Sequence, residues 1–87
     1  MEKVVRILNE QGVHARPASI FAKTASRFKS NVSIVQGNKV ANAKSIINIM
    51  GLCLKKGEEI KIITEGVDEK EAMEALVVQI ENKFGEE

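Results

Sequence analysis

The sequence predicts an α+β fold of the open-faced sandwich type, in which helices cover one face of a mostly antiparallel sheet. Short β-rich stretches and amphipathic stretches follow one another in the order β-α-β-β-α-β-α over the 87 residues. The pair Gly37-Asn38 between two of the strands is typical of a two-residue hairpin turn, because both residues tolerate positive φ. This length suits one small domain, residues 1–87, with four strands and three helices.

The first half of the chain predicts three strands and one helix. Residues 2–8 are rich in β-branched side chains and end at the loop 9–12. Val32 and Ile34 alternate with polar residues as the second strand, and Val40 follows the hairpin turn in the third. Between them a helix begins near Ala15, with a proline allowed in its first turn. Its buried face is expected to comprise Ala18, Phe21, Ala22, Ala25 and Phe28.

The second half predicts a short helix over about 46–53 with Ser45 as its N-cap, and then a strand over about 60–64. The last helix is expected to begin at Asp68, with Glu71 three residues on completing a capping-box-like start, and to stop at Gly85. Its buried stripe is expected to comprise Met73, Leu76, Val77, Ile80 and Phe84.

Composition excludes disorder and collagen, with 44% hydrophobic and 29% charged residues. A net charge of +1 argues against a strong nucleic-acid binder, but the charge is divided unevenly. Residues 1–57 carry a net +8, and residues 58–87 carry a net −7. This asymmetry indicates a charged surface for a partner. Two solvated faces that attract each other are the alternative.

Several classes of function are not expected. No targeting segment or apolar span of about 20 residues is found, so we expect a cytoplasmic protein without membrane insertion. One His and one Cys are too few ligands for a metal site. The sequence contains no glycine-rich phosphate loop, so no nucleotide cofactor is expected. The Phe residues lie at core-facing positions, so no surface aromatics are expected to stack on the bases of a nucleic acid. Cys53 lies between Leu52 and Leu54, which predicts a small buried side chain rather than a reactive thiol.

His14 is the residue that points to chemistry. It lies between the loop and the start of a helix, where free backbone N–H groups and the helix dipole favour an anion. Arg16 adds donors suited to phosphate. A nucleophilic imidazole in this setting meets the requirements of a phosphohistidine carrier. The alternative is a surface N-cap with no chemistry. Ser45 has two readings as well, a plain N-cap and an N-cap that also tolerates phosphorylation.

Two segments carry a resemblance to a known family. Residues 12–19 (GVHARPAS) closely resemble the active-site motif of the HPr family, the histidine-containing phosphocarriers of the bacterial phosphoenolpyruvate:sugar phosphotransferase system. Residues 42–52 (NAKSIINIMGL) are similar to the regulatory serine segment of that family. The resemblance implies that His14 accepts a phosphoryl group on Nδ1 from Enzyme I and passes it to Enzyme IIA domains, with Arg16 and Pro17 shaping the site. The protein would then be a carrier rather than an enzyme with turnover of its own.

The resemblance also implies further partners. Ser45 matches a serine that HPr kinase/phosphorylase phosphorylates with ATP, which slows transfer from Enzyme I and allows binding to a catabolite-control transcription factor. A monomer is expected, with exchange of a β-strand into a dimer as the alternative. The implied partner patch is apolar and ringed by positive charge, and it comprises Ser19, Ile20, Lys23, Arg27, Lys44, Ile46, Ile47 and Met50.

Three positions depart from the family pattern near Ser45. Asn48 and Cys53 stand where glycine is common, and Gly51 stands where serine is common. The main alternative function is a regulatory HPr-like module, of the carbon-catabolite or nitrogen branch, that acts mainly through Ser45. A branch devoted to catabolite repression has Gln at the position of His14, so the histidine argues against it. A nucleic-acid binder that uses the basic half is the third and weakest hypothesis.

Overall fold

The computed structural model describes residues 1–85, and its element order agrees with the predicted one. The elements are β1 (Glu2–Arg6), α1 (Ala15–Ser26), β2 (Asn31–Gln36), β3 (Lys39–Asn42), α2 (Ile46–Gly51), β4 (Glu59–Glu65), α3 (Glu69–Glu81) and a closing 3-10 turn η1 (Lys83–Gly85).

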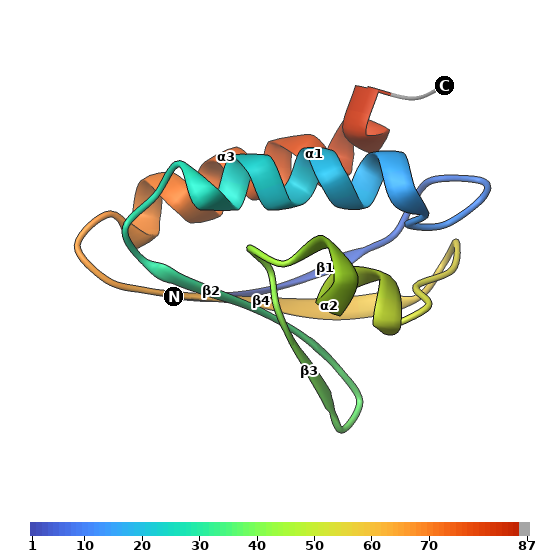
Figure 1. Cartoon of the computed structure of the whole chain (residues 1–87), viewed down its shortest axis with the longest axis horizontal. Coiled ribbons are helices and arrows are strands. Elements are labelled where there is room, and N and C mark those ends of the chain that lie inside the picture. The colour runs from blue at the N-terminus through green and yellow to red at the C-terminus, as the bar shows by residue number, and fades with distance from the viewer. Residues whose placement is uncertain (86–87) are drawn as a thin grey trace.

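The four strands form one sheet in the order β1-β4-β2-β3, and every neighbouring pair is antiparallel. Helices α1 and α3 lie side by side over one face of this sheet (Figure 1). Helix α2 contacts α1 and β3. The predicted open-faced α+β sandwich is therefore confirmed.

The hairpin between β2 and β3 has the expected two-residue loop, because Gln36 pairs with Lys39. Only the first loop residue, Gly37, has a positive φ, 60°. The turn therefore depends on the glycine alone and not on Asn38.

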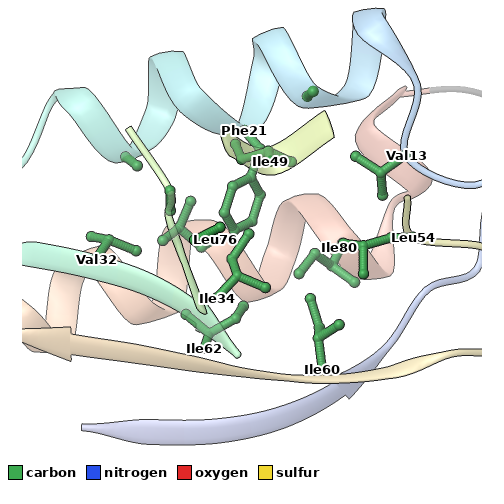
Figure 2. Close-up of a cluster of buried hydrophobic side chains, with 14 of the residues drawn as sticks. Val13, Phe21, Val32, Ile34, Ile49, Leu54, Ile60, Ile62, Leu76 and Ile80 are labelled. Carbon is green, nitrogen blue, oxygen red and sulfur yellow. The ribbon is translucent and has the colours of Figure 1, made fainter. Parts of the chain in front are cut away.

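The core lies between the sheet and the helices. Figure 2 shows Phe21 from α1 and Leu76 from α3 pointing toward Ile34 and Ile62 of the sheet, with Ile49 of α2 beside them. Each of these side chains is at most 2% exposed. Burying a side chain of this size contributes about 1.5–3 kcal/mol. The predicted stripe of the last helix is confirmed at Met73, Leu76, Val77 and Ile80. Phe84 is buried as well, but it lies in η1 beyond the end of α3.

All three helices end earlier than the sequence predicts. Helix α1 ends at Ser26, because the N–H groups of Arg27 and Phe28 donate to the carbonyls of Thr24 and Ala25, only three residues back. Phe28 is left half-buried beyond the helix. Helix α2 ends at Gly51 rather than near 53. Helix α3 ends at Glu81 rather than at residue 85. Apolar spacing marks a face that is buried, but it does not show where the backbone leaves the helix.

Asp68 is the N-cap residue of α3 as predicted, but the predicted capping box does not form. Its carboxylate makes no capping bond to α3 and instead accepts hydrogen bonds from the N–H groups of Lys29 and Ser30, both at 2.9 Å, and from the Ser30 hydroxyl. The Ser30 hydroxyl is the main reason that the pKa of Asp68 is lowered to about 2. A contact between distant segments thus replaces the local cap.

The expected burial of Cys53 is wrong. Its side chain is exposed, whereas Leu52 and Leu54 on either side are 5% and 4% exposed. Cys53 has a φ of 54°, just after the C-cap residue of α2. With both leucines turned into the core, the residue between them is left facing outward. The apolar neighbours in the sequence therefore did not predict its environment.

Candidate functional site

His14 is the N-cap residue of α1 and is half-buried. Its backbone is extended, with φ −90° and ψ −162°, and its carbonyl accepts the N–H of Ala18 at 3.0 Å. The imidazole makes no capping hydrogen bond to the helix. The predicted position is confirmed, but capping does not explain the choice of side chain.

The loop before His14 is held in place by one close approach of two backbones. The N–H of Val13 donates to the carbonyl of Leu54 at 3.0 Å. Gly12 has a φ of 70°, and a Cβ at this position would lie 2.2 Å from the Leu54 oxygen. Only glycine fits such a position without displacing the backbone. The glycine of the motif is therefore needed to place His14.

The start of α1 presents donors beside His14. The N–H groups of Ala15 and Arg16 belong to the first turn, so the helix contains no acceptor for them. Pro17, in the same turn, has no N–H and is buried. These donors lie at the positive end of the helix dipole. The Arg16 side chain is exposed, and its guanidinium makes no hydrogen bond or ion pair with any part of residues 1–85.

These groups open onto a cavity of about 540 Å³. It is lined by Asn9, Glu10, Gln11, His14, Arg16, Ile20, Lys83, Phe84 and Gly85. The sequence predicted His14 and Arg16 here, and it missed the acidic loop residue Glu10 and the whole of η1. No local motif could have indicated η1, because it lies at the other end of the chain. In Figure 1 η1 is seen beside the first turn of α1.

The turn η1 is anchored to the rest of the molecule at two points. The amide of Asn9, which is 2% exposed, donates from Nδ2 to the Lys83 carbonyl at 2.9 Å. The ring of Phe84 is buried and meets Phe21 edge to face, with centroids 6.0 Å apart. Lys83 and Phe84 both have positive φ, 53° and 56°. A left-handed conformation costs about 1–2 kcal/mol for a residue with a Cβ, which the burial of Phe84 offsets.

An ion pair borders the cavity. Glu10 is hydrogen-bonded to the ammonium group of Lys56. This bond and the Lys56 charge lower the pKa of Glu10, and the charge of Lys83 lowers it further. Glu10 is therefore a carboxylate whose charge Lys56 already balances.

Ser45 lies at a second site, outside the residues that line this cavity. It is the N-cap of α2 as predicted, and its Oγ accepts the backbone N–H of Asn48 at 3.2 Å and the Asn48 side-chain amide at 3.1 Å. The departure from glycine at position 48 thus supplies an extra hydrogen bond to Ser45. The fold does not bring Ser45 and His14 into one cavity.

Most of the predicted partner patch lies at the surface. Helix α2 exposes Ile46, Ile47 and Met50, which are 40%, 82% and 42% exposed. On the adjoining α1, Ser19 and Ile20 are half-buried and Lys23 is exposed, and Arg27, directly after the helix, is exposed as well.

Lys44 is the member of the patch whose environment differs from the expected one. It is half-buried, and its ammonium donates to the Phe28 carbonyl at 2.8 Å. The charge is thus engaged at the end of α1, where a cation is favoured. Lys44 joins two elements of the fold rather than standing free at the rim of the patch.

Comparison with known proteins decides the family. A family model described as "PTS HPr component phosphorylation site" matches residues 1–82. The chain belongs to the HPr family. The resemblance of the two segments is therefore confirmed, and the protein is a relative of known phosphocarriers.

Individual HPr relatives agree over nearly the full chain. The phosphocarrier protein HPr of Treponema pallidum (strain Nichols) is 44% identical over 85 residues, which is 98% of this chain and 97% of the relative. The HPr-like protein Crh of Halalkalibacterium halodurans is 46% identical over 83 residues, 95% of this chain and 99% of the relative. The crystal structure of HPr-C-His from Thermoanaerobacter tengcongensis is 49% identical, with a TM-score of 0.96 and coverage of 100% and 98%.

Two features are absent from the part of the chain that the structure describes. No helix within residues 1–85 is long and apolar enough to cross a membrane. The same residues contain no cluster of three or more His, Cys, Asp or Glu side chains arranged to hold a metal ion.

Proposed function

We propose that the protein is a phosphocarrier that accepts a phosphoryl group from phospho-Enzyme I on His14 and transfers it to Enzyme IIA domains for sugar uptake. The observation that carries this proposal is the position of His14 at the first turn of α1, in one cavity with Arg16. A nucleophile, open backbone donors and a guanidinium are what a transferable phosphoryl group requires.

The transfer exchanges one bond to phosphorus for another. The imidazole nitrogen, Nδ1 by the family resemblance, attacks phosphorus as the bond to the donor breaks, and the electron pair of that bond stays with the donor. The N–H groups of Ala15 and Arg16 and the Arg16 side chain stabilise the charge that arrives. Transfer to the acceptor reverses these steps. The protein begins and ends unmodified, so it is a carrier and has no turnover of its own.

The test uses Enzyme I and labelled phosphoenolpyruvate with the wild type, His14→Ala, Arg16→Ala and Lys70→Ala. We expect acid-labile, base-stable label on the wild type and none on His14→Ala. Arg16→Ala should be labelled more slowly with nearly unchanged thermal unfolding, because an exposed Arg contributes little to stability. Lys70 is exposed near the start of α3 and is the matched control. Full labelling of His14→Ala would refute the proposal.

Ser45 carries the proposed regulation. A phosphate at the start of α2 would add a charge of about −1.5 to −2 beside the apolar residues Ile47 and Met50. This change supports slower transfer from Enzyme I and binding to a catabolite-control transcription factor. HPr kinase/phosphorylase with ATP should give acid-stable label that Ser45→Ala abolishes. Absence of such label on the wild type would contradict this part.

A regulatory module acting mainly through Ser45 is the second candidate, raised by the similarity to the HPr-like protein Crh, although the histidine at position 14 argues against it. It predicts ATP-dependent labelling of Ser45 and no useful transfer through His14. The two-donor assay separates the candidates, since phosphoenolpyruvate with Enzyme I reports on His14 and ATP with the kinase reports on Ser45.

We further propose a monomer in the cytoplasm. Gel filtration should give a mass near 9.6 kDa. Twice this mass would contradict the monomer and would agree with the alternative, a dimer formed by exchange of a strand.

A further inference from the structure

We propose that Lys83 supplies a second positive charge to the phosphoryl group on His14, and that Asn9 is the positioning residue that keeps Lys83 at the cavity. This inference rests on the proposed phosphocarrier function. Asn9 and Lys83 lie near opposite ends of the chain. Lys83 belongs to the acid-rich segment 58–87, which has only three lysines.

The first support is placement. Lys83 lines the same cavity as His14 and Arg16. Its ammonium makes no hydrogen bond or ion pair with the part of the chain that the structure describes. The cation is therefore held at the site without a hydrogen-bonded partner among residues 1–85, although its charge acts on the nearby Glu10.

The second support is the backbone that holds it. Lys83 has a left-handed conformation, and so has Phe84 after it. The hydrogen bond from Asn9 to the Lys83 carbonyl and the buried ring of Phe84 keep this turn against α1. Residues held in unfavourable backbone conformations persist where surrounding contacts determine them, and they concentrate at functional sites. Here the conformation turns the chain back toward His14 after α3 has ended.

The third support is the balance of charge. Glu10 also lines the cavity, and as a carboxylate it would repel a phosphoryl group. It is hydrogen-bonded to Lys56, so this pair is neutral as a unit. Arg16 and Lys83 then leave a net charge of +2 around His14 among the residues described. A phosphoryl group brings about −1.5 to −2.

This arrangement assigns a role to each group. Lys56 is hydrogen-bonded to the Glu10 carboxylate, so Glu10 does not form an ion pair with Lys83. Lys83 and Arg16 then share the incoming dianion, which favours the phosphorylated form of the carrier. When the phosphoryl group leaves, both cations remain at the cavity.

The test measures the equilibrium of phosphoryl exchange between Enzyme I and the protein. Lys83→Gln should shift it toward phospho-Enzyme I by about threefold to tenfold, the range for one partly exposed cation beside a dianion. Lys83→Arg should restore it, and Lys70→Gln should leave it unchanged. The difference between the wild type and Lys83→Gln should shrink in 1 M salt, where charges are screened beyond about 3 Å.

Two further variants test the positioning. Asn9→Ala should shift the equilibrium in the same direction as Lys83→Gln, and the double variant should show no additional shift. Lys56→Gln should also shift it, since Glu10 is then released toward Lys83. Thermal unfolding is measured for each variant, so that a loss of stability is not taken for a change of equilibrium.

The outcomes separate this inference from the proposed function. An unlabelled wild type would refute both. Normal labelling of the wild type, with Lys83→Gln within twofold of it at low salt, would overturn the role of Lys83 alone. If Asn9→Ala unfolds at lower temperature but keeps the wild-type equilibrium, Asn9 is structural and its positioning role is wrong.

Discussion

Replacing Gly12 by alanine should destabilise the protein strongly and displace His14. The added Cβ would lie 2.2 Å from the Leu54 oxygen and 3.0 Å from the Lys55 Cα, and both are backbone atoms that cannot rotate away. The loop must therefore move. Its movement breaks the hydrogen bond from Val13 to Leu54, which is 3.0 Å long.

The size of the effect follows from two costs. A left-handed φ of 70° costs alanine about 1–2 kcal/mol. Part of this cost is offset, because alanine makes the unfolded chain less flexible than glycine does. Leaving the Val13 N–H without its acceptor costs about 1–3 kcal/mol. We expect a loss of about 2–4 kcal/mol in the free energy of unfolding. For a domain of this size, this corresponds to a fall in Tm of roughly 10–25 °C.

Urea unfolding at pH 7 measures this loss, and two other glycines are matched controls. Gly37 has a φ of 60° with open space around it, so Gly37→Ala should cost only about 1 kcal/mol. Gly51 has neither a positive φ nor a close neighbour, so Gly51→Ala should stay within about 0.5 kcal/mol of the wild type. If Gly12→Ala loses no more than Gly37→Ala, the close approach to Leu54 does not constrain the loop.

Three further perturbations test the parts of the fold where the environment was not predicted. Cys53→Gly should stabilise the protein by about 0.5 kcal/mol in urea unfolding, because glycine relieves the φ of 54°, whereas Cys53→Ala should not; equal effects would refute the strain. The lowered pKa of Asp68 means that its stabilisation is present above pH 4 and is lost as the pH falls toward 2, so the Tm difference between the wild type and Asp68→Asn should narrow over that range; a constant difference would refute this. Lys44→Met should lower the free energy of unfolding by about 1 kcal/mol through loss of the bond to the Phe28 carbonyl, and no loss would mean that this contact is not stabilising.

The element order and the buried faces could be predicted because they depend on local periodicity. In β4, every second side chain is buried, at Ile60, Ile62 and Thr64. In α3, the buried residues from Met73 to Ile80 recur at helical spacing. Both patterns reflect which face of an element meets the core. The ends of the elements could not be predicted in this way. Phe28 continues the helical spacing, but the backbone has already left the helix.

The candidate site was predicted only as far as it is contiguous in the sequence. His14 and Arg16 are neighbours along the chain, and the segment around them places both at one helix start. Glu10 and Lys83 were missed, because the sequence does not indicate that the last turn of the chain folds back to the first loop. The contact of Asn9 with Lys83 joins positions 74 residues apart.

By itself, the sequence determined the class of fold, the family and the position of His14, the proposed phosphoryl acceptor, since each depends on residue types at short, regular spacing. Tertiary structure alone decided which distant groups surround that acceptor and which local signals are overridden. Cys53 is exposed because its neighbours turn inward, and Asp68 binds the loop after α1 rather than its own helix. The physical reason is the same in both cases. A side chain takes the partner that packing brings within hydrogen-bonding or contact distance, and sequence spacing does not contain that distance.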